Sequence, residues 1–288
     1  MMAPAEMEPS ENKPHLQISA RFADQVYSHL VGNYAPLSRF PLMLAIHGPP
    51  GHGKSFQCST LLDEWGVKTF YISGSELESA IAGGPAQMIR QKYTEANQEY
   101  AKKGRACCLL IDDIDAGIGD FGSKTTYTVN RQNVSSILMN LADRPTLLDG
   151  EPVSRTPIIA TANNLEALYE PLRRPGRMTK FFWSMSVDEL RCVVGVLFHD
   201  ILCADDCDRL TNENQSEPPA FFEQVRAEAI SMVLAMTANP EDRARFLRNL
   251  IIDPERGRRS SSIYLQCQNQ MPNLVFAIAE KMHSTKGN

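Results

Sequence analysis

The sequence of 288 residues lacks a long hydrophobic run and an excess of positive charge. No stretch reaches the roughly 18 apolar residues that a membrane-spanning helix needs. Acidic residues outnumber basic ones by 34 to 29, so a phosphate-rich polymer is not an expected partner. The opening MMAPAEMEPSENKP has neither the apolar centre of a signal peptide nor the basic character of a transit peptide. We therefore expect a cytoplasmic protein with no membrane or nucleic-acid partner, and a disordered segment over residues 1–15.

Cysteine provides no framework of crosslinks. The chain has seven cysteines, an odd number, and Cys107 and Cys108 lie inside an apolar run of strand length. This usage is typical of thiols that fill the core of a protein in a reducing compartment. We predict no disulfide framework.

One histidine and two cysteines have a spacing that could place them on one face of a helix. His199, Cys203 and Cys207 recur at every fourth residue. Such a face could bind a metal, although the sequence offers no certain fourth ligand. The simpler alternative is a pair of buried thiols beside an acidic helix end, because three aspartates flank them.

Apolar runs of strand length alternate with segments of helical spacing in the first two thirds of the chain. The expected strands lie near residues 42–46, 69–72, 107–111, 158–161 and 181–183. Expected helices cover about 16–33, the residues after 54, 85–103 and 130–143. The strands are continuously apolar, which is typical of a parallel sheet covered on both faces. We predict an α/β nucleotide-binding domain over residues 16–186.

The strand signals stop after about residue 187. Helices are expected over 188–204, 219–236, 240–251 and 272–282, with a polar loop over 205–218. We therefore predict a smaller all-helical subdomain over residues 187–288.

A glycine-rich loop follows the first expected strand and leads into a helix. It has the pattern G-x-x-x-x-G-K-[ST], whose backbone N–H groups cradle nucleotide phosphates. Lys54 would neutralise the terminal phosphates, and the Ser55 hydroxyl would bind Mg²⁺. The predicted nucleotide-binding residues here are Gly48, Pro49, Pro50, Gly51, His52, Gly53, Lys54, Ser55 and Phe56.

Acidic residues end the third expected strand. Asp112 would hold Mg²⁺ with Ser55, and Asp113 would orient the attacking water. Most nucleotide hydrolases of the ring-forming kind have a glutamate as the second of these two acids, so the side chain of Asp113 is one methylene shorter than is usual. The alternative is that both are ordinary loop acids at the end of a strand.

Three further candidate residues lie downstream. Asn163 follows the fourth expected strand, where its amide could bond the γ-phosphate or the lytic water, although asparagine also commonly closes a strand into a turn. Arg174 and Arg177 are candidate arginine fingers: each could stabilise the charge that develops on a phosphoryl group bound to a neighbouring subunit. A solvated basic turn is the alternative for this segment.

At these spacings the motifs resemble the AAA+ ATPase family, and within it the Rubisco activases, particularly those of cyanobacterial type. The resemblance covers about residues 25–190 and includes segments outside the nucleotide motifs. These are SGSELESAIAG (73–83), IRQKYTEA (89–96), CCLLIDDIDAG (107–117), TYTVNRQNV (126–134) and GRMTKFFW (176–183).

The resemblance implies a hexameric ring that couples ATP hydrolysis, with Mg²⁺, to remodelling of Rubisco and release of inhibitory sugar phosphates. It implies pore loops at residues 80–84 and 117–127, although Gly84 stands where activases usually carry glutamate. It also implies that Arg226 reaches the nucleotide from the helical subdomain. Two residues further on, the family carries a second arginine, whereas this chain has Glu228.

Two other functions remain open at this point. The first is a nucleotide-dependent scaffold or chaperone that binds Rubisco or another client with little remodelling. The second is a small-molecule kinase of the phosphate-loop class, for which the sequence shows no acceptor site.

Overall fold

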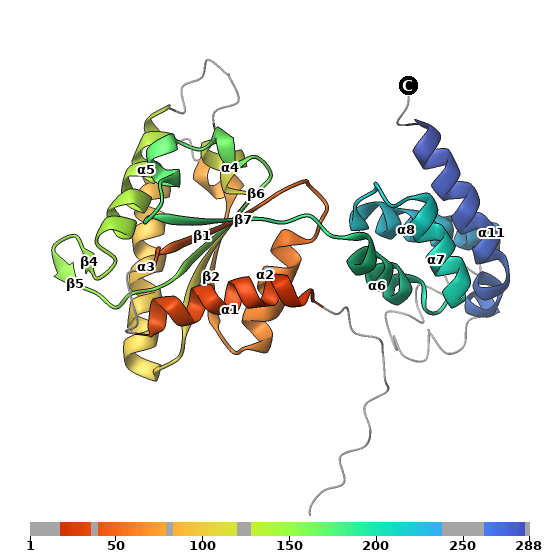
Figure 1. Cartoon of the computed structure of the whole chain (residues 1–288), viewed down its shortest axis with the longest axis horizontal. Helices are drawn as coiled ribbons and strands as arrows, with labels where there is room; N and C mark the ends of the chain where they lie inside the picture. The colour runs from red at the N-terminus through yellow and green to blue at the C-terminus, as the bar shows by residue number, and fades with distance from the viewer. Residues whose placement is uncertain (1–17, 36–39, 79–82, 120–127, 238–261, 286–288) are drawn as a thin grey trace, which may run out of the picture. The chain divides into compact units, whose positions relative to one another are not determined.

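The computed structural model describes residues 18–35, 40–78, 83–119, 128–237 and 262–285. Contacts divide the chain into two units, residues 18–184 and the residues from Met185 onward, whose elements are labelled in Figure 1. The segment 1–15 and the helix expected over 240–251 lie outside the described residues. Within the described ranges, no helix is both long and apolar enough to cross a membrane.

The first unit is built on a parallel sheet in the order β2-β3-β6-β1-β7. The strands are β1 (Met43–His47), β2 (Lys68–Ser73), β3 (Cys107–Asp112), β6 (Ile158–Ala162) and β7 (Met178–Phe182). The register pairs His47 with Ala162 and Phe182, and Asp112 with Ser73, so the carboxyl ends form one edge. The loop after β1 therefore opens on that edge between β6 and β7, and parallel sheets bind ligands at this edge. The predicted parallel sheet is confirmed.

Helices cover both faces of this sheet. They are α1 (Ala20–Tyr34), α2 (Lys54–Glu64), α3 (Gly84–Lys103), the short α4 (Ile114–Ile118) and α5 (Thr128–Asp143). One core cluster joins alternate strand residues to α3 and α5, and includes Ala45, Leu109, Ile111, Tyr93 and Leu138. Leu44 and Leu110 are buried outside that cluster because successive strand residues point to opposite faces. Figure 1 shows α1 and α2 on the face opposite to α3 and α5, which explains the continuously apolar strands.

The second unit is helical. Its described helices are α6 (Val187–Phe198), α7 (Ala204–Glu213), α8 (Pro219–Thr237) and α11 (Ser262–Thr285). A capping box starts α6, because the Ser186 and Glu189 side chains each accept a bond from the other residue's backbone N–H. Apolar residues of all four helices form its core, among them Leu190, Phe198, Leu210, Phe222 and Val275.

Two sequence predictions in this unit are wrong. The helix expected over 188–204 ends at Phe198, and the polar loop expected over 205–218 contains α7. The acidic residues of α7 concealed its apolar face, on which Cys207, Leu210 and Thr211 are buried at helical spacing. The last helix also starts earlier than expected, at Ser262, with Pro272 inside it.

A small hairpin was not predicted. Strands β4 (Leu147–Leu148) and β5 (Glu151–Pro152) pair antiparallel beyond the end of α5. Asp149 and Gly150 form the turn with φ angles of 50° and 88°. This Asp-Gly pair is the sequence signal of a two-residue hairpin turn.

Candidate functional site

The glycine-rich loop connects β1 to the first turn of α2. Gly51 and Gly53 adopt left-handed φ angles of 77° and 71°, and Gly48 has φ 154°. A Cβ atom on Gly48 would lie 1.9 Å from the Trp183 carbonyl oxygen, so only glycine fits there. The loop thus brings backbone N–H groups to the positive end of α2, which is an arrangement that binds phosphate.

Lys54 ties this loop to the end of β6. Its side chain is buried, and Nζ donates to the carbonyl oxygens of Gly48 and Pro49, each at 2.9 Å, and to Asn163 Oδ1 at 2.8 Å. Burial lowers the pKa of Lys54, while the nearby carboxylates of Asp113, Asp115 and Asp112 oppose that shift. Lys54 and Asn163, which are 109 positions apart in the sequence, therefore meet directly.

Three hydroxyl groups surround the carboxylate of Asp112. Ser55 Oγ and Thr161 Oγ1 donate to Oδ1, and the Tyr71 hydroxyl donates to Oδ2 at 3.0 Å. Burial, then the bond and charge of Asp112, raise the pKa of Tyr71 to about 12, so the phenol stays a donor at neutral pH. The oxygen-only donor set of Ser55, Asp112 and Thr161 suits Mg²⁺.

Asp113 stands beside this carboxylate in a left-handed conformation, with φ 50°. Its backbone N–H donates to Thr161 Oγ1 at 2.9 Å, which holds the turn in place. The pKa of its carboxyl group is raised by desolvation and by the negative charges of Asp112 and Asp115. The positive charge of Lys54 partly offsets this rise. A carboxylate with a raised pKa is a stronger proton acceptor, as the orienting of a water requires.

Asp115 fixes the position of Asn163. It is only 3% exposed, and its Oδ2 accepts the backbone N–H groups of Asn163 at 3.0 Å and Asn164 at 2.7 Å. Asn164 Oδ1 then accepts the Glu166 N–H at 3.0 Å and starts the next turn. The carboxyl edge therefore gathers Lys54, Ser55, Asp112, Asp113 and Asn163 in one site.

The two finger candidates lie at the other edge of the sheet. The Arg177 carbonyl oxygen accepts the Met43 N–H at 3.2 Å, at the end of β1 opposite to Gly48. Arg174 is exposed and lies near Glu170, with nitrogen–oxygen distances of 3.3 and 3.4 Å. Neither arginine meets the phosphate loop of its own chain.

Arg226 forms a bidentate pair within the helical unit. Its guanidinium donates to Asp200 at 2.7 and 3.0 Å and also to the Leu197 carbonyl oxygen. Burial would raise the pKa of Asp200, but the bond and charge of Arg226 outweigh it and lower the pKa. In this structure Arg226 joins the end of α6 to α8.

The structure does not place His199, Cys203 and Cys207 on one helix face. His199 closes α6, whereas Cys203 begins the separate helix α7, so the spacing carries no common face. Cys207 is buried in the helical core, and Cys203 Sγ lies 3.1 Å from Asp206 Oδ2. Among the described residues, no three or more histidine, cysteine or acidic side chains gather into a group that could hold a metal ion.

The expected pore loops fall mostly outside the described residues. Residues 79–82 and 120–127 are not described. Of the first loop, Gly83 caps α3 with φ 81° and Gly84 is its first residue. Of the second, Gly117 and Ile118 belong to α4.

Sequence reasoning missed three residues that hold the site. Thr161 precedes Asn163 by two positions, and a buried threonine at a strand end was its only signal. Trp183 supports the loop, because its indole Nε1 donates to the His52 carbonyl oxygen at 2.8 Å. Its backbone N–H also donates to the His47 carbonyl oxygen at 2.7 Å. Tyr71 had no local signal, because its contact with Asp112 depends on the pairing of β2 with β3.

Comparison with known proteins relates the chain to a family of ATPases. Residues 44–185 match the family described as "ATPase family associated with various cellular activities (AAA)". The chain is 42% identical over 219 residues to the ribulose bisphosphate carboxylase/oxygenase activase of Anabaena sp., and 38% identical over 247 residues to the chloroplastic activase of Cucumis sativus. The matches cover 73% and 83% of this chain but 53% and 60% of those relatives, so the chain spans little more than half their length. Residues 44–185 therefore form an AAA ATPase domain, and the chain is similar to the Rubisco activases.

Proposed function

We propose that this protein binds ATP with Mg²⁺ at the carboxyl edge of its sheet and hydrolyses it. The observation that carries the proposal is the meeting of Lys54 with Asn163, beside the carboxylate of Asp112. A phosphate loop, an acid and a polar amide within hydrogen-bond reach of one another are the parts that phosphoryl transfer needs.

Each residue then has a distinct task. Lys54 would exchange its three present acceptors for phosphate oxygens, and Ser55 and Asp112 would hold Mg²⁺. The bound metal would supply charge that neutralises the phosphate oxygens. Asp113 accepts a hydrogen bond from the attacking water, and the amide of Asn163 fixes the position of that water or of the phosphate.

The proposal includes a homo-oligomeric ring, expected to be hexameric. Arg174 and Arg177 lie at the edge away from their own phosphate loop. If they act on a nucleotide, it is the one bound by another copy, and a head-to-tail contact that repeats itself closes into a ring where its rotation permits. Hydrolysis would then depend on assembly.

The suggested client is Rubisco, and the suggested work is remodelling that releases inhibitory sugar phosphates. The likeness to activases over most of this chain supports this assignment. We also infer a cytoplasmic location, since the six cysteines whose side chains the structure describes are free thiols and four of them are buried.

The direct test is incubation of the protein and ATP with Rubisco that has been inhibited by its own substrate. We expect carboxylation to recover with the unaltered chain and to stay suppressed with Lys54→Met. An absence of recovery at every protein ratio, together with intact ATP hydrolysis, would refute the Rubisco assignment alone.

A nucleotide-dependent scaffold or chaperone for another client is the second candidate. Two observations favour it: the shorter acid at Asp113, and the bonding of Arg226 to Asp200 within the helical unit. Client binding by Asp113→Asn protein, which keeps the phosphate loop, with no release of sugar phosphate by that variant or by the unaltered chain, would support the scaffold.

A further inference from the structure

The guanidinium of Arg177 is fixed by three hydrogen bonds of equal length. Nε and Nη2 donate to Oδ1 and Oδ2 of Asp143, and Nη1 donates to the Pro171 carbonyl oxygen, each at 2.7 Å. A guanidinium has five N–H groups. Three are therefore engaged here, and two remain, one on each terminal nitrogen.

Arg174 provides a contrast within the same segment. Its side chain is 60% exposed and its partner Glu170 is 66% exposed, at a closest distance of 3.3 Å. The Arg177 side chain is only 25% exposed. A guanidinium that is fixed before its target arrives loses little conformational freedom on binding, so Arg177 is the better prepared of the two.

Asp143 comes from an element distant in the sequence. It is the last residue of α5, and the hydrogen bond from Arg177 is the main cause of its lowered pKa, which keeps the carboxylate charged. A negative charge at the C-terminus of a helix opposes the helix dipole, so α5 itself gains nothing from this residue. Its position is explained by the arginine that it binds.

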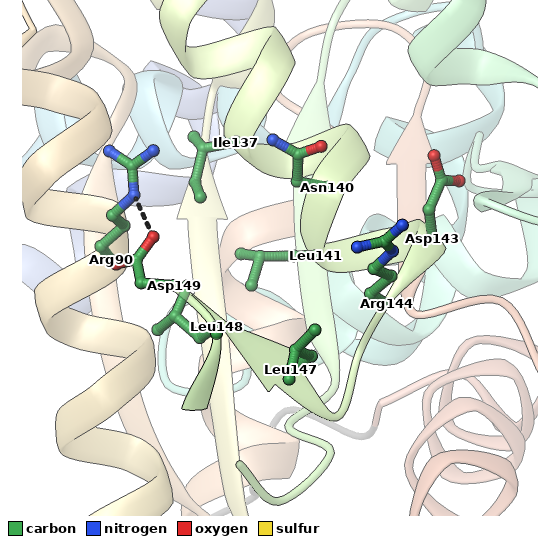
Figure 2. A pocket seen from close by; sticks show the side chains of 10 residues that line it. Arg90, Ile137, Asn140, Leu141, Asp143, Arg144, Leu147, Leu148 and Asp149 are labelled. Atoms are coloured by element: carbon green, nitrogen blue, oxygen red, sulfur yellow. Dashed lines mark ion pairs between the residues drawn. The ribbon is translucent and has the colours of Figure 1, made fainter. Parts of the chain in front are cut away.

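Further charge lies beside Asp143. Figure 2 shows it next to Arg144, at the rim of a cavity of about 420 Å³ that also lies against Arg90 and the β4–β5 hairpin. The charge of Arg144 also lowers the pKa of Asp143. The carboxylate is thus affected by the charge of both arginines, but it accepts hydrogen bonds from Arg177 alone.

We propose that Asp143 is a positioning residue for Arg177: it holds the guanidinium so that the two remaining N–H groups face the nucleotide of the neighbouring subunit. This inference rests on the proposed ring, in which Arg177 acts in trans. The competing explanation is a surface ion pair that joins α5 to the start of β7 and contributes only to stability.

The test compares Asp143→Ala, Arg177→Ala and the double variant in steady-state ATP hydrolysis. Misplacement of a catalytic group by about 1 Å can cost about 100-fold in rate, so we expect Asp143→Ala to lower kcat by about 10- to 100-fold with KM unchanged. The double variant should be no slower than Arg177→Ala, because Asp143 would act only through Arg177. Asp143→Glu, which keeps the carboxylate, should recover part of the rate.

Glu99→Ala is the matched control. It removes a carboxylate that pairs with Lys103 at 3.0 Å within α3, away from the phosphate loop, and we expect kcat to stay within about twofold of the unaltered chain. The melting temperature should fall by no more than about 3 °C in both single carboxylate variants, because both pairs are partly exposed. Light scattering should show one oligomeric state for all variants.

Three results would overturn the inference. The first is an unchanged kcat in Asp143→Ala while Arg177→Ala is slow. That result would refute the positioning role of Asp143 but not the role of Arg177 as a finger. The second is a double variant slower than Arg177→Ala, or a loss of assembly in Asp143→Ala, since either shows a structural role. The third is a normal kcat in Arg177→Ala, which refutes the proposed finger together with the inference.

Discussion

The hydroxyl of Thr161 joins the two acids of the site, and its removal is predicted to damage both stability and metal binding. Oγ1 donates to Asp112 Oδ1 and accepts the Asp113 N–H at 2.9 Å, in a residue that is 0% exposed. Thr161→Val keeps the shape of the side chain and removes both bonds. An N–H left without a partner costs about 1–3 kcal/mol, and a bond to a charged group is worth about 1.5–3 kcal/mol. Because Ser55 and Tyr71 still serve the carboxylate, we expect a loss of about 2–4 kcal/mol.

Urea unfolding can be followed by tryptophan fluorescence, since both tryptophans, Trp65 and Trp183, belong to the sheet unit. The second readout is the Mg²⁺ dependence of binding of a fluorescent ATP analogue. Thr156→Val is the matched control: Thr156 is 1% exposed and accepts one longer bond, 3.3 Å, from Asn97. It should cost about 1 kcal/mol and leave Mg²⁺ binding unchanged. Equal stability losses in the two variants, with normal Mg²⁺ binding in both, would refute the role given to Thr161.

Three further predictions address other parts of the sheet unit. Tyr71→Phe removes only the hydroxyl that fixes Asp112 Oδ2. Titration with the ATP analogue should show about threefold to tenfold weaker Mg²⁺ binding, with binding of metal-free nucleotide unchanged. Unchanged or tighter Mg²⁺ binding would contradict this. Gly117→Ala would bring a Cβ atom within 2.3 Å of the Gly74 carbonyl oxygen and should lower the free energy of unfolding in urea by about 1–3 kcal/mol. Gly195→Ala, whose Cβ atom would meet nothing within 4 Å, should not destabilise the protein. Equal effects of the two substitutions would argue against the clash. His29 donates Nε2–H to the Ile158 carbonyl oxygen, and burial lowers its pKa to about 3, below the unfolded value of 6.5. Its contribution to stability is therefore complete above pH 6.5 and declines by up to about 1.4 kcal/mol per pH unit below it. His29→Gln should flatten the pH dependence of urea unfolding between pH 6 and 4, and an unchanged slope would contradict the assignment.

The parts of the site that the sequence predicted are those with local signals. Gly48, Lys54 and Ser55 follow an apolar strand directly, and Asp112 ends another. A parallel sheet brings such strand ends to one edge whatever lies between them, so Asn163 could be expected near Lys54.

The unpredicted parts depend on contacts between distant segments. Tyr71 reaches Asp112 through strand pairing, and Asp143 reaches Arg177 across 34 positions. Nothing in either local sequence indicates its partner. Helix α7 was missed for another reason, because its acidic residues resemble a loop when its buried face is unknown.

The central claim is that one subunit completes the active site of the next. Mixing two variants tests it most directly: Arg177→Ala keeps the phosphate loop, and Lys54→Met keeps the finger. Each alone should hydrolyse ATP at a small fraction of the normal rate. In a randomly mixed ring at equal amounts, roughly a quarter of the interfaces pair an intact loop with an intact finger, so about a quarter of the normal rate should return. A mixture no faster than the average of the two separate variants would contradict the account.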